Sequence, residues 1–180
     1  MKNEKGKRIG AWLWFFMLSF VIITFWIIFL EFLSLWGTFK VIVHWPAGLL
    51  LMELLWPAGI TLMEFIYTVG FAAYVVYALN ALLKHKPNAI SLAIKTNIVT
   101  IIFFISQGIR YFVLMGKDTD VWNATVFTTV FCIISLAYFY FSNGLKEAYP
   151  MAQRKSLIVD NLLFAAIILM IILVNVVFYL

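Results

Sequence analysis

Five long apolar runs limit this chain to one kind of fold. A helix needs about 20 mostly apolar residues to cross a lipid bilayer. The runs cover residues 9–30, 57–83, 89–115, 121–141 and 157–180, and none carries more than two charged residues. They are continuous rather than alternating, which argues against the strands of a membrane barrel. The sequence therefore predicts an all-α integral membrane protein, a five-span helical bundle.

The composition excludes the soluble alternatives. Hydrophobic residues make up 65% of the 180 residues and charged residues only 12%. Soluble domains are about half apolar and about a quarter charged, so this chain cannot cover a water-facing surface. We therefore expect no soluble enzyme, no disordered chain and no nucleic-acid partner, although the net charge is +5.

The third run is interrupted by two cations. Lys95 lies near one of its ends and Arg110 near the other, and the uncharged stretch between them is too short to cross alone. Lys95 must therefore extend toward one interface while Arg110 lies near the other. A re-entrant hairpin here would leave four spans, but the distribution of the cations favours five.

The lysines and arginines also indicate the orientation, because they concentrate in cytoplasmic loops. Of the 13 cations, four lie in residues 1–8, three in 84–95 and three in 146–155. With five spans these three regions share one side of the membrane. We expect the N-terminus in the cytoplasm and the C-terminus on the extracytoplasmic side.

An eleven-residue repeat follows the first run. The pattern WPAGxxLME occurs from Trp45 and again from Trp56. Each proline suits the first turn of a helix and pushes the preceding Trp toward an extended conformation. The repeat predicts a short interfacial or re-entrant helix over residues 46–55, a break at Trp56, and a second span from Pro57.

Polar residues gather near the outer ends of the expected spans. Glu64 and Arg110 lie at similar depth by helical rise, and Gln107 shares a helix face with Arg110. Ionisable groups at this depth usually pair or face a wet cavity. We predict either a stabilising Glu64–Arg110 pair or a polar site for a lipid headgroup or other amphiphile. The other candidates for this site are Glu31, Glu53 and His44.

The chain carries no recognisable pattern of catalytic or metal-binding residues. It has no nucleophile elbow, no phosphate-binding loop and no metal-spaced His/Cys set. We interpret the single cysteine, Cys132, as a small buried or lipid-facing hydrophobe. We therefore expect no enzyme activity, no cofactor and no metal.

Three stretches show a resemblance to a known family. The opening Ile9-Gly10-Ala11-Trp12-Leu13 and the pair Glu64-Phe65 are similar to the starts of the first two spans in small prokaryotic membrane proteins catalogued as domain of unknown function 2569. Residues 140–149 resemble a family motif with matches at Ser142, Lys146 and Tyr149 and departures at Gly144 and Ala148. The resemblance covers about residues 9–150. It implies a multi-span protein of the plasma (inner) membrane and no particular activity.

Two functions are favoured at this point, and an enzyme acting on lipid is the third alternative. The small size, the short loops and the lack of a catalytic pattern favour a non-catalytic accessory or scaffold subunit of a larger membrane protein complex. The alternative is a small transporter or a lipid-handling protein with a polar site near the outer leaflet. The expected partners are membrane lipids and either other membrane protein subunits or further copies of this chain.

Overall fold

A computed structural model describes residues 11–43, 51–115, 119–149 and 156–179, and nearly all of these residues lie in helices. The short helix α5 (Asn143–Ala148) follows the fourth of five long ones. All five long helices are long and apolar enough to cross a membrane, which confirms the predicted all-α fold with five such helices. They are α1 (Ala11–Val43), α2 (Leu51–Leu83), α3 (Ala89–Met115), α4 (Thr119–Phe141) and α6 (Ile158–Tyr179).

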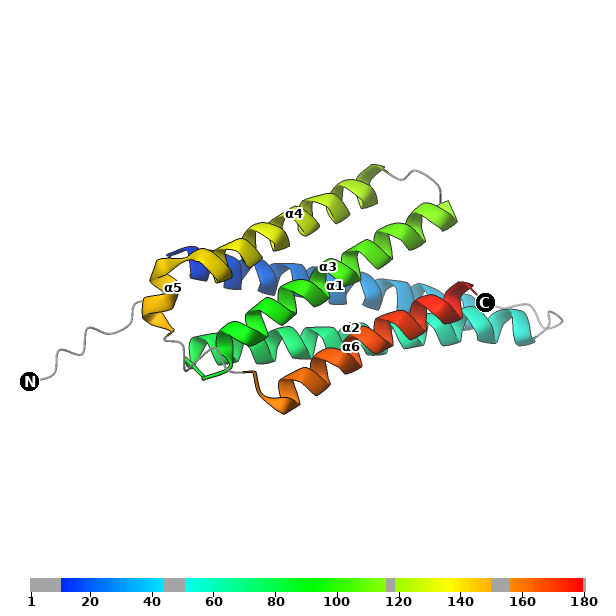
Figure 1. Ribbon diagram of the computed structural model, residues 1–180. Coiled ribbons are helices and arrows are strands. Elements are labelled where there is room, and N and C mark those ends of the chain that lie inside the picture. Colours follow the sequence, from blue (N-terminus) through cyan, green and yellow to red (C-terminus); the bar gives the residue numbers. More distant parts are fainter. Residues whose placement is uncertain (1–10, 44–50, 116–118, 150–155, 180) are drawn as a thin grey trace, which may run out of the picture.

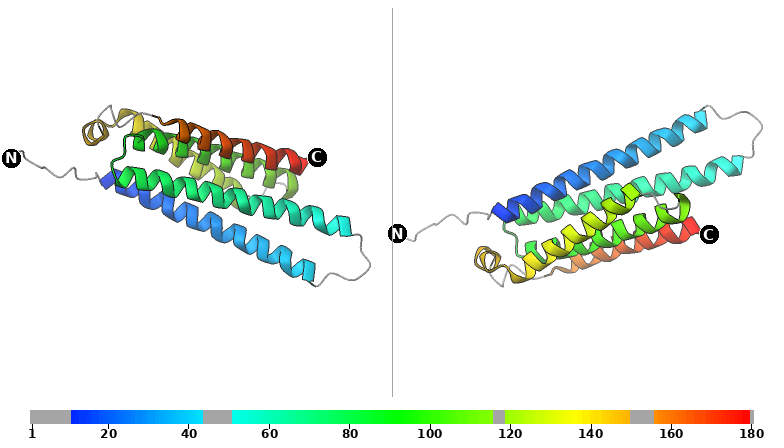
Figure 2. Two further views of the ribbon diagram at one scale, coloured as in Figure 1. Left: turned by 90° about the horizontal axis from the view of Figure 1, so that it is seen from below. Right: turned by 90° about the horizontal axis from the view of Figure 1, so that it is seen from above.

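The helices form one elongated bundle with two distinct ends (Figure 1). At the end that we call proximal, α1 and α3 begin, α2 and α4 end, and α5 lies across the bundle. The opposite end is the distal end. Figure 2 shows α1 and α6 on opposite sides of the bundle. The helix α2 is central, because it packs against α1, α3 and α6.

The third run forms one continuous helix. Its range, Ala89–Met115, coincides with the expected span, and its 27 residues correspond to about 40 Å of helix. A re-entrant hairpin would require a reversal inside this segment. The alternative with four long helices is therefore wrong.

The helix α1 is longer than the first predicted span. We expected that span to end at residue 30, before Glu31, but the helix continues to Val43. A charged side chain changes where a helix meets water but leaves its backbone hydrogen bonds intact. The first proline in the sequence is Pro46, so no residue that removes a backbone N–H interrupts α1.

The predicted break at Trp56 is also wrong. The helix α2 begins at Leu51 and runs without interruption through Trp56 and Pro57. The expected interfacial helix over 46–55 is thus partly absorbed into α2, and residues 46–50 lie outside the described residues. A proline inside a helix removes one hydrogen bond. A complete break frees up to four N–H and four C=O groups, which cost several kcal/mol each in apolar surroundings.

Aromatic rings fill the contacts between helices. Phe71 of α2 stacks on Phe103 of α3, with ring centroids 5.3 Å apart. Phe16 and Phe20 of α1 contact Phe131 of α4, with centroids 5.4 and 6.1 Å apart. These offset and tilted arrangements are the favoured ones for aromatic pairs. Large rings therefore set the spacing of α2 from α3 and of the proximal part of α1 from α4.

Small residues set the spacing of α3 from α4. A Cβ atom added to Gly108 of α3 would lie 2.9 Å from Cγ2 of Thr125 on α4. From Thr125 onward α4 presents a stripe of small buried residues, since Thr128, Cys132 and Ser135 are also at most 6% exposed. Small residues at a helix contact allow the backbones to approach closely in an apolar environment.

The contact between α3 and α4 predicts the effect of enlarging Gly108. Gly108→Ala should destabilise the bundle, because the new methyl group overlaps Thr125; overpacking of this kind costs about 1–3 kcal/mol. Gly70→Ala is the matched control, since a Cβ there meets no atom within 4 Å and alanine is the better helix former by about 1 kcal/mol. Thermal unfolding in detergent measures both. Equal melting temperatures for the two variants, or no partial rescue of Gly108→Ala by Thr125→Ala, would contradict the prediction.

Candidate functional site

Two of the predicted polar residues, Glu64 and Gln107, lie on α2 and α3 in the distal half of the bundle. Glu64 is 7% exposed on α2, and Tyr67, about one turn further along, is 3% exposed. Gln107 of α3 donates a hydrogen bond from Nε2 to the hydroxyl of Tyr67. Gln107 and Tyr67 therefore form a polar group between α2 and α3, about one turn from Glu64. The sequence analysis identified Glu64 and Gln107 but not the hydroxyl of Tyr67.

Arg110 lies at the same height as this group. It is 21 residues from the start of α3, and Glu64 is 19 residues from the end of α2, which correspond to about 32 and 29 Å. The side chain of Arg110 lies outside the described residues, so its pairing with Glu64 stays a prediction.

Of the remaining candidates, the structure describes the side chain of one and not those of the other two. Glu31 is half-buried on α1, 20 residues from the start of that helix, which is about 30 Å. It shares the level of Glu64. Glu53 lies at the start of α2 with its side chain outside the described residues, and His44 lies outside them altogether. The structure thus bonds Gln107 to Tyr67 about one turn from Glu64. It places Glu31 and Arg110 at the height of Glu64 and leaves Glu53 and His44 untested.

A second polar group, which the sequence analysis did not predict, surrounds Asp160 near the proximal end. Asp160 of α6 is fully buried. Its Oδ2 atom accepts hydrogen bonds from Nδ2 of Asn88 at 2.8 Å and from the backbone N–H of Leu157 at 3.2 Å. Its Oδ1 atom accepts one from the hydroxyl of Tyr77 at 3.2 Å. The carboxylate therefore caps α6 and ties it to α2 and to the turn before α3.

Lys95 lies beside this group, at the contact between α3 and α6. Its Nζ atom donates to Oγ of Ser156 and to Oδ1 of Asn161, both at 2.5 Å. The Ser156 hydroxyl also donates to Oδ1 of Asn161, at 2.8 Å. The side chain of Lys95 thus reaches the start of α6, which agrees with the expectation that it extends toward one end of the bundle.

The turn between α2 and α3 is closed by an unusual residue for its position. His85 has a φ of 50°, in the left-handed region that glycine usually occupies. The backbone N–H groups of His85 and Lys86 donate to the carbonyls of Leu82 and Ala81 at 3.2 and 2.9 Å. This pair of bonds is a Schellman motif, which commonly ends a helix with glycine at the position of His85.

Tyr149 holds this turn against the end of α5. Its ring stacks on that of His85 with centroids 4.8 Å apart, and its hydroxyl donates to the Leu82 carbonyl at 2.5 Å. Burial, with a smaller contribution from neighbouring Tyr138, raises the pKa of the Tyr149 hydroxyl to about 12. The stacking on Tyr149 helps to compensate for the backbone strain of His85 at a position that glycine usually occupies.

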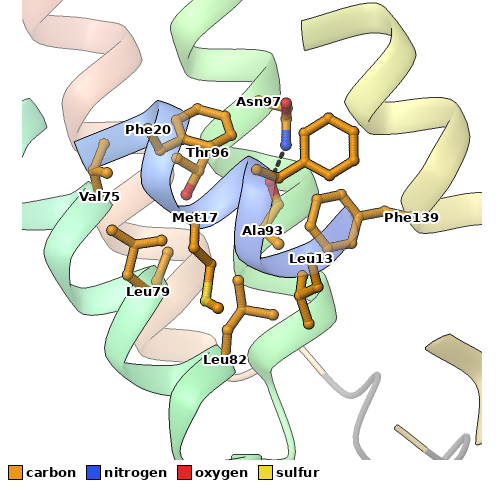
Figure 3. A pocket seen from close by; sticks show the side chains of 12 residues that line it. Leu13, Met17, Phe20, Val75, Leu79, Leu82, Ala93, Thr96, Asn97 and Phe139 are labelled. Atoms are coloured by element: carbon orange, nitrogen blue, oxygen red, sulfur yellow. Dashed lines mark hydrogen bonds between the residues drawn. The ribbon is translucent and has the colours of Figure 1, made fainter. Parts of the chain in front are cut away.

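A small pocket lies between α1, α2, α3 and α4 in the proximal half (Figure 3). Its wall is apolar except for Thr96 and Asn97, which donate to the carbonyls of Leu92 and Ala93 at 2.8 Å. The Oδ1 atom of Asn97 is buried and finds no partner in the described part of the chain. No titratable side chain lines this pocket, so its lining offers mainly apolar contact.

Comparisons with known proteins add no assignment. No protein-family model, no curated protein and no solved structure matches this chain. Within the described ranges no group of three or more His, Cys, Asp or Glu side chains could hold a metal ion. The two polar groups and the pocket therefore rest on their own geometry, and that geometry is suited to binding and to holding helices together.

The raised pKa of Tyr149 predicts a pH-dependent loss of stability. Between pH 10 and about pH 12 an unfolded tyrosine ionises while the buried hydroxyl stays protonated. The folded state then binds more protons than the unfolded state, so stability falls as the pH rises. Tyr149→Phe removes the hydrogen bond to Leu82 and should cost about 0.5–1.5 kcal/mol at pH 8. The difference in stability between the wild-type chain and Tyr149→Phe should shrink between pH 10 and about pH 12, as measured by thermal unfolding. A stability difference that stays constant up to pH 12 would contradict the raised pKa of Tyr149.

Proposed function

We propose that the chain spans the plasma (inner) membrane of a prokaryote five times and serves as a non-catalytic accessory subunit of a larger membrane protein complex. The observation that carries the proposal is the separation of α1 from α4 toward the distal end of the bundle. The separated part of α1 is the surface on which a spanning helix of the partner docks.

The proximal part of α1 packs firmly against this chain. Leu13, Phe16, Met17 and Phe20 are each at most 5% exposed. Phe16 lies between Phe131 and Tyr138 of α4, with ring centroids 5.4 and 5.2 Å away. Figure 1 shows α4 rising away from α1 beyond this contact.

The distal part of α1 packs far less. None of its described side chains from Ile28 to Val43 is buried, although α1 stays beside α2 over this length (Figure 2). Large apolar side chains along it face outward: Phe32 is 51% exposed and Phe39 is 55% exposed. More than three turns of helix beyond Glu31 therefore pack mainly against α2.

One face of this distal part carries small residues. Ser34 lies 18 residues after Phe16, about five helical turns, so both point in the same direction from α1. Ser34, Gly37 and Val41 share that face, and all three are exposed. A Cβ atom at Gly37 would meet no atom within 4 Å. Small residues at such a position allow the backbone of another spanning helix to approach closely.

The docking surface predicts the effect of enlarging Gly37. Gly37→Leu should not lower the thermal stability of the isolated chain, because a Cβ atom there meets open space and leucine is a better helix former than glycine. It should reduce the recovery of the partner in mild detergent about tenfold or more, since overpacking costs about 1–3 kcal/mol and 1.4 kcal/mol is a factor of ten. Quantitative mass spectrometry of the co-purified chains measures the loss.

Gly59→Leu is the matched control for this experiment. Gly59 is an exposed glycine on α2 with equally open space around its Cβ position. Partner recovery should be normal in this variant. A wild-type chain that purifies as a bare monomer, or equal losses in both variants, would refute the docking surface. A complex of twice the mass of the chain would identify the partner as a second copy.

The orientation within the membrane is a separate part of the proposal. The concentration of lysine and arginine at the proximal end supports a cytoplasmic N-terminus and an extracytoplasmic C-terminus. Alkaline phosphatase fused to the C-terminus should be active, and green fluorescent protein fused there should be dark. The opposite result would place the C-terminus in the cytoplasm and require an even number of crossings.

A further inference from the structure

The polar group around Lys95 is open to the surface, unlike the one around Asp160. Ser156 and Asn161 are exposed and Lys95 is half-exposed, whereas Asp160 is fully buried. Both oxygens of the Asp160 carboxylate accept hydrogen bonds from Tyr77, Asn88 and Leu157. The negative charge of Asp160 therefore lies inside the bundle, and the positive charge of Lys95 lies at its surface.

The ammonium group of Lys95 is held by neutral oxygens. Its two hydrogen-bond acceptors are a hydroxyl and an amide carbonyl, on Ser156 and Asn161. No acidic side chain in the described part of the chain forms an ion pair with it, although Asp160 lies within electrostatic reach. A cation inside a spanning segment usually pairs with an anion or faces a polar ligand. Within the described ranges, Lys95 has no anionic side chain in direct contact with its ammonium group.

We propose that Lys95, Ser156 and Asn161 bind the phosphate group of an anionic phospholipid from the leaflet at the proximal end. The ammonium group has a third N–H that these two residues leave unused. The single hydrogen of the Ser156 hydroxyl goes to Asn161, so Ser156 holds Lys95 and Asn161 in place. The Asn161 side-chain amide adds neutral N–H donors at the same spot. A phosphate diester carries one negative charge and several acceptor oxygens, which matches this set of donors.

The surroundings favour a lipid over free phosphate. Lys95 lies six residues into α3, about 9 Å along an apolar helix. Leu162, next to Asn161, is 65% exposed, and Ile158 at the start of α6 is 78% exposed. Acyl chains attached to a bound headgroup can cover this apolar surface of α6. Basic sites between helices on the cytoplasmic side are known to select anionic headgroups.

The proposal rests on the membrane-spanning part of the proposed function and not on the partner complex. A chain that purifies without any partner can still bind the lipid. The two proposals can therefore fail independently.

The test measures lipid retention by native mass spectrometry of the full chain in detergent, with phosphatidylglycerol and phosphatidylcholine added in equal amounts. The wild-type chain should retain phosphatidylglycerol in preference. Lys95→Gln should reduce that preference about fivefold or more, because it removes a charge-assisted hydrogen bond to the bound phosphate. Lys95→Arg keeps the charge and should retain the preference. Asn161→Ala should weaken it while keeping all charges.

Lys84→Gln is the matched control, because Lys84 is an exposed lysine at the same end of the bundle. It removes the same charge and should leave the preference intact. Melting temperatures of all variants separate loss of lipid from loss of fold. An equal preference in Lys95→Gln and Lys84→Gln would overturn the site. Displacement of the lipid by millimolar inorganic phosphate would overturn its assignment to a lipid headgroup.

Discussion

The buried carboxylate of Asp160 is the contact on which the arrangement of the proximal end depends. A buried charge costs several kcal/mol unless hydrogen bonds compensate for it. Here the donors come from α2, from the turn before α3 and from the start of α6 itself. These bonds set where α6 begins relative to α2 and α3. They thereby place Ser156 and Asn161 within reach of Lys95, so the proposed lipid site is a consequence of the capping of α6.

The five long helices could be predicted from the sequence because each apolar run must satisfy its own backbone hydrogen bonds. The ends of the helices were predicted less well. Glu31 was taken as the end of a span, but a charge does not interrupt helical hydrogen bonding, and α1 continues to Val43. Pro57 was taken as the start of a helix, but one lost hydrogen bond costs less than a break. α5 was missed, although Ser142 is a usual N-cap residue and accepts a hydrogen bond from Leu145.

The polar sites also include residues that local sequence spacing could predict and residues that only the packing of distant helices brings together. Helical rise alone brought Glu64 and Arg110 to similar heights, and face periodicity placed Gln107 beside Arg110. The group around Asp160 could not be predicted in this way. Tyr77 and Asp160 are 83 residues apart and Asn88 and Asp160 are 72 apart. The side of α6 that faces α2 is determined by how the helices pack. That packing cannot be predicted from a single sequence.

Along one face of α1 the size of the side chains changes where the neighbouring helix departs. Exposed phenylalanine and tryptophan are unremarkable at a lipid contact, since lipid chains are as apolar as they are. Phe16 and Phe20 are large where α4 is near. Ser34 and Gly37 are small where no helix of this chain covers them. Against fluid lipid a small residue gains little dispersion energy, because it offers few atoms for contact. It stabilises a membrane helix when it allows another backbone to come close. The small residues on this face therefore favour a protein neighbour over lipid.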